Sequence, residues 1–234
     1  MKITSMGIIA VIFVIIAVAM AGCASTTPSS STQTQASVSP SSGAPSSDST
    51  SSSSPQVGTT MSSSSVFGSG YGWVEYKTTA SYGGKDMTTD TKSVRSASTY
   101  QGSPAIEVKS TITSSSGTTM TSDAFWDTGM SKILGGTMTT TVNGKTMTVN
   151  LPTSVIAVAE GNSFERQSTL TFDGIEPVSV PAGTYPVASK YTRTVNGTES
   201  TIWSAPGVSV PVKMTGSSSS GTYTMELVGW GKLQ

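Results

Sequence analysis

Short segments of alternating apolar and polar residues, separated by glycine turns, constrain this chain more than any other feature. In three segments the apolar residues share one face of the implied strand; they are Ile106, Val108 and Ile112, then Phe164, Leu170 and Phe172, then Val208, Val210, Val212 and Met214. A period of two is typical of half-buried β-strands. Only Ser154–Ala159 fits a short helix as well as it fits a buried strand. The sequence therefore predicts an all-β domain.

Turn signals recur at intervals that suit hairpins. They include Gly83-Gly84, Gln101-Gly102, Asn143-Gly144 and Asn196-Gly197. Asn-Gly favours a type I′ turn because both of its residues must adopt a positive φ. The spacing of these signals predicts about nine to eleven strands between residues 66 and 234.

The Asn143-Gly144 turn implies a specific pairing of the strands on either side. One face pairs Val142 with Lys145, Thr140 with Met147, and Met138 with Val149; the other pairs Thr141 with Thr146, Thr139 with Thr148, and Thr137 with Asn150. A slip of one residue would turn the threonine ladder inward, so the register is well specified. We expect the apolar face to be buried and the threonine ladder to face water.

The Asn196-Gly197 turn implies a second hairpin whose two faces are less distinct. Tyr191 opposes Ile202 on one face, and Lys190 opposes Trp203 on the other. Since each face carries a large apolar side chain, we expect both faces to be partly covered.

Strands that are apolar on one side must hide that side, and the sequence supplies no helices to cover it. We therefore expect a large curled antiparallel meander that forms an open or closed barrel. A two-layer sandwich is the alternative. Gly135-Gly136 interrupts a strand segment and predicts a bulge or a sharp bend.

The N-terminus has the pattern of an export signal. Lys2 precedes an uncharged apolar run that is shorter than the roughly 20 residues of a membrane span. The run ends in Met20-Ala21-Gly22-Cys23, which resembles the lipobox of bacterial and archaeal lipoproteins. That resemblance implies a signal peptide over residues 1–22, cleavage before Cys23 and a lipid on its thiol. An uncleaved membrane anchor is the alternative, and either reading places the rest of the chain outside the cytoplasm.

Residues 23–65 are expected to form a disordered linker that follows the lipidated cysteine. More than half of residues 24–65 are Ser or Thr, and Asp48 is the only charge. Such a segment buries too little apolar surface to offset the entropy lost on ordering. The sequence thus predicts a tethered antiparallel β domain over residues 66–234.

A further resemblance covers roughly residues 175–230. Val178-Ser-Val-Pro-Ala-Gly-Thr-Tyr185 is followed by Ile202-Trp203-Ser-Ala-Pro-Gly-Val208 and by Met225-Glu226-Leu227. This order resembles a family of uncharacterised extracytoplasmic domains, similar in architecture to the Lol-type lipoprotein carriers. The resemblance implies a curved antiparallel sheet that forms an unclosed barrel around a lipid, with Pro181, Gly183, Pro206 and Gly207 in turns.

The residue inventory argues against several kinds of chemistry. The chain has no histidine and one cysteine, which excludes His-based triads, Cys–His catalysis and four-cysteine zinc sites. No nucleotide-binding or calcium-binding motif is present, and balanced charge gives no basic stripe for nucleic acid. We therefore expect no catalytic residues, no metal, no cofactor and no nucleic-acid partner.

The remaining candidates concern binding. The apolar residues on the expected inner face are candidates for a pocket lining, and they are Met138, Met147, Val149, Ile106, Val108, Phe172, Val210, Val212, Met225 and Leu227. Asn196 lies in a glycosylation sequon at an expected hairpin tip. These features predict a non-catalytic, membrane-anchored extracytoplasmic lipoprotein that binds an apolar ligand or lipid. The alternative is a structural or partner-docking protein of the cell envelope.

Overall fold

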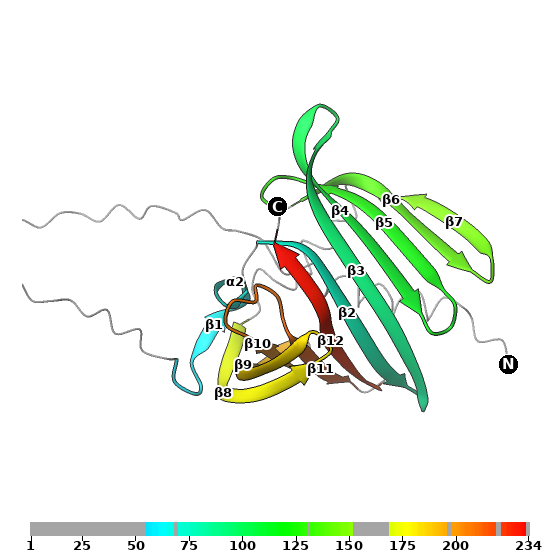
Figure 1. Cartoon of the computed structure of the whole chain (residues 1–234). Helices are drawn as coiled ribbons and strands as arrows, with labels where there is room; N and C mark the ends of the chain where they lie inside the picture. Colours follow the sequence, from blue (N-terminus) through cyan, green and yellow to red (C-terminus); the bar gives the residue numbers. More distant parts are fainter. Residues whose placement is uncertain are drawn as a thin grey trace, which may run out of the picture.

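The alternating segments form strands that join into one continuous sheet (Figure 1). The computed structural model describes residues 55–67, 70–130, 132–151, 169–195, 198–218 and 221–232. The strands are β1 (Thr60–Ser62), β2 (Tyr71–Tyr82), β3 (Lys85–Tyr100), β4 (Ser103–Ser114), β5 (Thr119–Trp126), β6 (Ile133–Val142), β7 (Lys145–Asn150), β8 (Thr169–Val180), β9 (Gly183–Val195), β10 (Thr198–Ser204), β11 (Lys213–Ser218) and β12 (Gly221–Lys232). The only helix among the described residues is the single turn α2 (Ser63–Val66).

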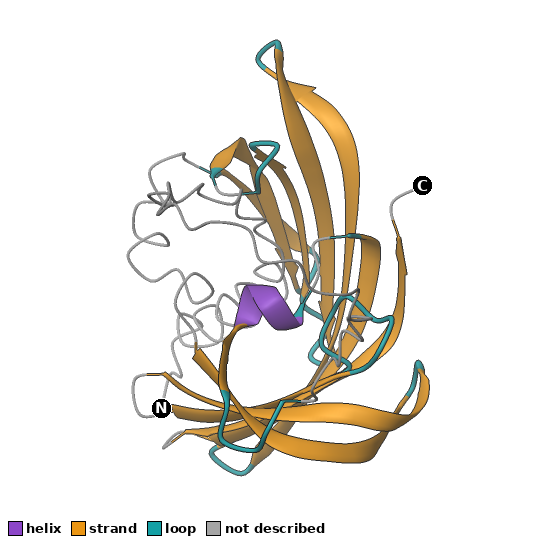
Figure 2. Cartoon of the chain, turned by 90° about the vertical axis from the view of Figure 1, so that its left-hand side faces the viewer, coloured by secondary structure: helices purple, strands orange, loops and turns teal. Residues whose placement is uncertain are grey.

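The sheet is antiparallel throughout and has the order β1-β8-β9-β10-β11-β12-β2-β3-β4-β5-β6-β7. Two meanders, β2–β7 and β8–β12, are therefore joined where β12 pairs with β2. The sheet curls without closing, and α2 lies within the curl (Figure 2). This confirms the predicted all-β curled meander in its open form. A two-layer sandwich is wrong, because all twelve strands belong to one sheet.

The registers implied by the sequence are confirmed. Every pair predicted for the β6–β7 hairpin is present, and the ladder hydroxyls of Thr139 and Thr148 lie 2.9 Å apart. Asn143 and Gly144 have φ values of 51° and 76°, as a type I′ turn requires. In the second hairpin, Tyr191 opposes Ile202 and Lys190 opposes Trp203. Both Ile202 and Trp203 are buried, so both faces are covered there.

The predicted irregularity at Gly135-Gly136 is confirmed. The β5–β6 register shifts between Phe125 and Trp126, opposite Gly135. A side chain at Gly136 would place its Cβ 2.1 Å from the carbonyl oxygen of Asp123. Glycine is therefore required for the close approach of the two backbones at this bulge.

A single large apolar core lies inside the curl of β8–β12 and β2. It includes Leu170 and Phe172 from β8, Val212 before β11, and Leu227 from β12. The turn after β8 reaches across this core, since the Ala182 amide donates to the Leu227 carbonyl at 2.9 Å. Apolar burial of this kind is the main stabilising term of such a fold.

The sequence predicted a domain that starts at residue 66. In the structure the fold already includes β1 (Thr60–Ser62) and α2 (Ser63–Val66). β1 pairs with β8 at one end of the described sheet, and Phe67 after α2 joins the core. The predictions for residues 1–22, Cys23, the linker over residues 24–54, Ser154–Ala159, Phe164 and the turn at 196–197 lie outside the described residues. No helix within the described ranges is long and apolar enough to cross a membrane.

Candidate functional site

We call the inner face the side of the sheet that carries Val74 and Tyr76 on β2 and Leu227 on β12, because these side chains belong to the core inside the curl. On β8–β12 this face is mainly apolar, and its buried polar residues are Arg193 and Ser200. On β3 the inner face is polar, and its buried residues are Thr89, Thr91, Ser93 and Arg95. These four residues are defined as the β3 polar stripe.

The polar stripe occupies one face of an interior strand, whose other face is exposed at Asp90, Lys92 and Val94. β3 pairs with β2 on one side and with β4 on the other, so neither of its edges is free. Ser93 lies between Val74 and Ser110, and Thr91 lies between Tyr76 and Ile112. The stripe is thus flanked by both apolar and hydroxyl side chains, since Thr89 lies between Thr78 and Ser114.

Some hydroxyls of this region are satisfied by other side chains. The Ser93 and Ser110 hydroxyls lie 2.8 Å apart and bond to each other. Next to the stripe, the Tyr76 hydroxyl donates to the Pro211 carbonyl oxygen at 2.9 Å. These bonds tie β3 to β4, and β2 to the segment before β11.

Other polar atoms of the same face have no hydrogen-bond partner. They are the Oγ1 atoms of Thr78, Thr89 and Thr91 and the Nε atom of Arg95. Buried polar atoms without a partner are uncommon in folded proteins, and each one costs about 1–3 kcal/mol of stability. Four such atoms on adjacent strands distinguish this face from the rest of the described structure.

Arg95 is the charged member of the stripe. Its side chain is 5 % exposed, and its guanidinium carbon lies 3.7 Å from the centre of the Tyr71 ring. None of the four ion pairs among the described residues involves Arg95. Its one described interaction is therefore the cation–π contact with Tyr71.

The carboxylates near this region belong to the outer face. Glu75, Glu107 and Asp123 each alternate with a buried residue and so point away from the inner face. Glu75 lies 3.7 Å from Lys92, and Glu107 lies 3.0 Å from Lys109. Among the described residues, no aspartate or glutamate is buried.

Asp123 has a perturbed acidity. Partial burial, and secondly the nearby charge of Glu107, raise the pKa of its carboxyl above the ordinary value of 3.8. Its Oδ1 atom is buried without a hydrogen-bond partner. This carboxyl lies on the outer face near the Glu107–Lys109 ion pair, on the opposite side of the sheet from Arg95.

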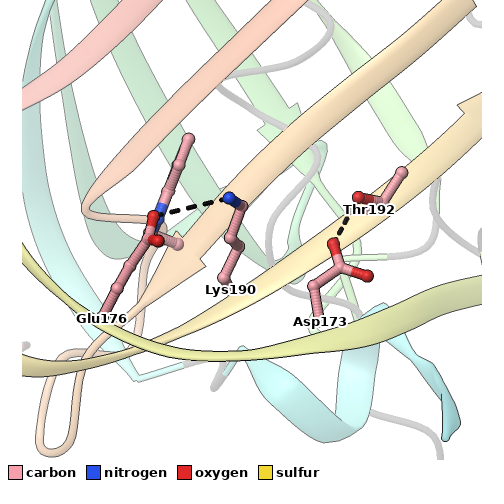
Figure 3. Close-up of polar contacts among 5 residues, drawn as sticks. Asp173, Glu176, Lys190 and Thr192 are labelled. Carbon is pink, nitrogen blue, oxygen red and sulfur yellow. Dashed lines mark hydrogen bonds and ion pairs between the residues drawn. The ribbon is translucent and has the colours of Figure 1, made fainter. Parts of the chain in front are cut away.

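A second polar cluster lies on β8 and β9, and Figure 3 shows its labelled residues. Lys190 Nζ lies 3.6 Å from Glu176 Oε1, and Trp203 Nε1 donates to the same oxygen at 2.7 Å. Close by, the Thr192 hydroxyl donates to the Asp173 carboxylate. Each group has a partner, so the cluster holds the strands together and covers Trp203.

The ten predicted lining residues do not come together as one pocket. Phe172, Val210, Val212, Met225 and Leu227 are buried in the large core, where they pack against one another. Val108 is buried beside Arg95, whereas Ile106 and Met138 are only partly buried.

For Met147 and Val149 the prediction of a buried inner face is wrong. These side chains are 59 % and 37 % exposed. They lie on β7, which pairs only with β6 among the described strands and forms an edge of the sheet. The correct register therefore did not bury them, because no described element covers this edge.

Sequence reasoning missed the polar stripe. Polar residues occupy both faces of most of β3, so hydrophobic alternation gives no signal there. The one available signal was a long, almost wholly polar segment between two alternating strands, since a central strand is expected to be apolar on its covered face.

The described residues contain no group of three or more Cys, Asp or Glu residues that could hold a metal ion. On β3 the polar groups of the inner face are the hydroxyls of Thr89, Thr91 and Ser93 and the guanidinium of Arg95. They can donate and accept hydrogen bonds and can pair with an anion.

Comparison with known proteins gives limited results. No family model and no curated protein matches the chain. Among solved structures, it is similar to a DUF1329 family protein from Desulfovibrio piger, with a TM-score of 0.31 and 10% identity over 68% of this chain and 84% of that one. It is also similar to a Bacteroides fragilis protein named as exported and as having a YmcC-like fold, with a TM-score of 0.30 and 12% identity over 69% of this chain and 96% of that one. Likenesses at these TM-scores do not establish a common function.

Proposed function

We propose that this chain is a membrane-tethered, extracytoplasmic binding protein that holds an amphiphilic ligand on the inner face of β2–β4 without transforming it. The observation that carries the proposal is the set of unpartnered buried polar atoms on Thr78, Thr89, Thr91 and Arg95. A bound molecule with polar groups would supply the missing hydrogen bonds. The apolar side chains beside the stripe would contact its apolar parts.

This proposal changes the expected ligand. The apolar residues of β8–β12 fill a packed core, so they stabilise the fold instead of lining a cavity. The unsatisfied atoms lie on β2 and β3 and are polar. The sequence suggested an apolar ligand or a lipid, and a ligand with both polar and apolar parts fits this face better than a purely apolar one.

Binding without catalysis is supported by the chemistry of the face. General acid–base catalysis needs a side chain that exchanges a proton near the working pH. The described inner face offers Thr and Ser hydroxyls and Arg95, and none of these serves as a base unaided. The carboxylates of the same strands lie on the outer face.

The location outside the cytoplasm is supported by the sequence of residues 1–23. An apolar segment after Lys2 is followed by the lipobox-like Met20-Ala21-Gly22-Cys23. Cys23→Ala should leave an unprocessed precursor that incorporates no labelled lipid. Unchanged mass and unchanged labelling in the variant would contradict lipidation at Cys23.

The ligand proposal is tested on the full chain recovered from membranes. We expect native mass spectrometry and solvent extraction to find a bound amphiphile on the wild-type protein. Thr89→Val with Thr91→Val removes two of the unpartnered hydroxyls and should reduce occupancy. Thr139→Val with Thr148→Val is the matched control, because this pair lies on the outer threonine ladder. A wild-type protein without bound ligand would contradict the proposal.

The partner-docking alternative is favoured by one observation. β7 is an edge strand with exposed apolar side chains at Met147 and Val149. Exposed edges and apolar side chains are typical of surfaces that pair with another chain. A photocrosslinker placed at position 147 in intact cells should then capture one specific neighbour, and a placement at Asp90 on the outer face of β3 should not.

A further inference from the structure

We propose that the ligand of the inner face carries an anionic group, a carboxylate or a phosphate, and that Arg95 binds it. This inference rests on the proposed function, since it names the chemistry of the ligand at the same face. We place the anionic group of the ligand beside Tyr71 and Val108, at the Arg95 end of the β3 polar stripe.

The first support is charge complementarity. Arg95 is buried, and an arginine keeps its charge in a protein. Burying a charge without a partner is strongly unfavourable. The described inner face contains no carboxylate to compensate it, because Glu75, Glu107 and Asp123 point outward. An anion from outside the chain would provide the compensation.

The second support is the geometry of the guanidinium. The guanidinium carbon lies 3.7 Å from the centre of the Tyr71 ring, and the group carries five N–H donors. One of these donors, on Nε, is buried and has no acceptor. A guanidinium can form two parallel hydrogen bonds with a carboxylate or phosphate.

The third support is the arrangement of the other unpartnered atoms. Thr89 lies six residues from Arg95 on the same strand and the same face, a distance of about 20 Å. Thr91 lies between them and also has an unpartnered hydroxyl. The Tyr76 and Ile112 side chains border Thr91 on the neighbouring strands. An elongated amphiphile with its anionic end at Arg95 would contact all of these groups.

The test measures binding of three probes that share one alkyl chain to the full-length protein. Dodecyl phosphate and dodecanoate are anionic, and dodecanol is neutral; each is used below its micelle concentration. We expect at least one anion to bind the wild type about tenfold or more tightly than dodecanol does, as a charge-assisted pair would give. Which of the two anions binds more tightly identifies the headgroup.

Variants then assign the preference to Arg95. Arg95→Met should remove the preference for the anion, so that its affinity falls by about tenfold or more relative to that of dodecanol. Lys92→Met is the matched control, because it removes a positive charge from the same strand on the outer face, where Lys92 is exposed. It should retain the preference. Arg95→Lys keeps the positive charge but lacks the planar set of N–H donors, so its preference for the anion over dodecanol should be intermediate.

The outcomes separate the two proposals. If all three probes bind the wild type equally, the anionic group is refuted while an amphiphile on the inner face stands. If none binds and the protein from membranes carries no ligand, both proposals are refuted. If Arg95→Met does not fold, the comparison of the three probes on the wild type decides alone. A preference that Lys92→Met removes equally would show general attraction and refute the role of Arg95.

Discussion

The two meanders of the sheet bury different kinds of side chain on the same inner face. In β8–β12, together with β2, most buried side chains are apolar and pack into one core that includes Leu170, Val212 and Leu227. The buried polar exceptions there are Thr78, Arg193 and Ser200. In β3 the buried side chains are hydroxyls and a guanidinium. The backbone pairing is continuous between the two regions, because β12 joins β2 and β2 joins β3.

This difference indicates separate roles for the two regions. The apolar core gains stability from burial and needs no partner outside the chain. The polar stripe lowers stability, because it removes polar atoms from water without replacing their hydrogen bonds. Regions that lower stability commonly serve binding, where a ligand restores the missing interactions. Four sets of variants measure the comparison directly.

The largest effect is expected in the apolar core. Leu227→Ala removes a side chain that is fully buried and should lower the free energy of unfolding by about 2–5 kcal/mol, measured by urea denaturation. Met147→Ala on the exposed edge strand β7 should change it by less than about 0.5 kcal/mol. Similar losses for both variants would show that β7 is covered.

Arg95→Met is expected to act in the opposite direction. Replacing a buried unpaired charge by an apolar side chain of similar length should raise the free energy of unfolding of the ligand-free protein by about 1–4 kcal/mol. Ligand-free protein is prepared by unfolding and refolding in denaturant before the measurement. A clear loss of stability would mean that the Tyr71 contact outweighs the burial, and the guanidinium would then be structural.

A smaller contrast is expected between two neighbouring hydroxyls of the stripe. Thr91→Val replaces an unpartnered buried hydroxyl and should stabilise the ligand-free protein by about 1 kcal/mol. Ser93→Ala breaks the bond with Ser110 and should destabilise it by about the same amount. If both variants changed the free energy of unfolding in the same direction, the distinction between hydrogen-bonded and unpartnered hydroxyls on β3 would be refuted.

The smallest effect concerns the outer carboxyl of Asp123. Its pKa is raised in the folded state by burial and then by Glu107, so folding favours the protonated form. The resulting stability is present below the ordinary pKa and is lost as the pH rises through the folded value. Asp123→Asn should therefore raise the free energy of unfolding near neutral pH by a few tenths to about 1 kcal/mol.

The pH dependence provides the control for this prediction. The advantage of Asp123→Asn should disappear in acid, where the wild-type carboxyl is itself neutral. An advantage for Asp123→Asn that persists unchanged at low pH would exclude titration as its cause.

Much of the fold could be predicted from the sequence. Asn143-Gly144 fixed the β6–β7 register because the turn type and the threonine ladder specify the same pairing. The shortage of helices and the one-sided strands predicted a curled sheet, and the glycine pair predicted the bulge near Phe125. These features depend on local residues, which the sequence displays directly.

The candidate site could not be predicted in the same way. Thr91 and Arg95 are of residue types typical of an exposed strand, yet they are buried on the inner face of β3, an interior strand of the sheet. Met147 is of a residue type that is usually buried, and it is exposed because β7 lies at the edge of the described sheet. Position within the sheet, which long-range pairing decides, therefore determined burial more than residue type did.

The account is tested most directly by the Nε–H signal of Arg95 in a nitrogen-15 NMR spectrum of the full-length protein. The chain has only three arginines, so Arg95→Lys assigns the signal by its loss. Addition of the anionic probe that binds more tightly should shift this signal strongly downfield and slow its exchange with water, while dodecanol should leave it in place. A signal that neither anionic probe moves would contradict the claim that the inner face of β3 is where the ligand binds.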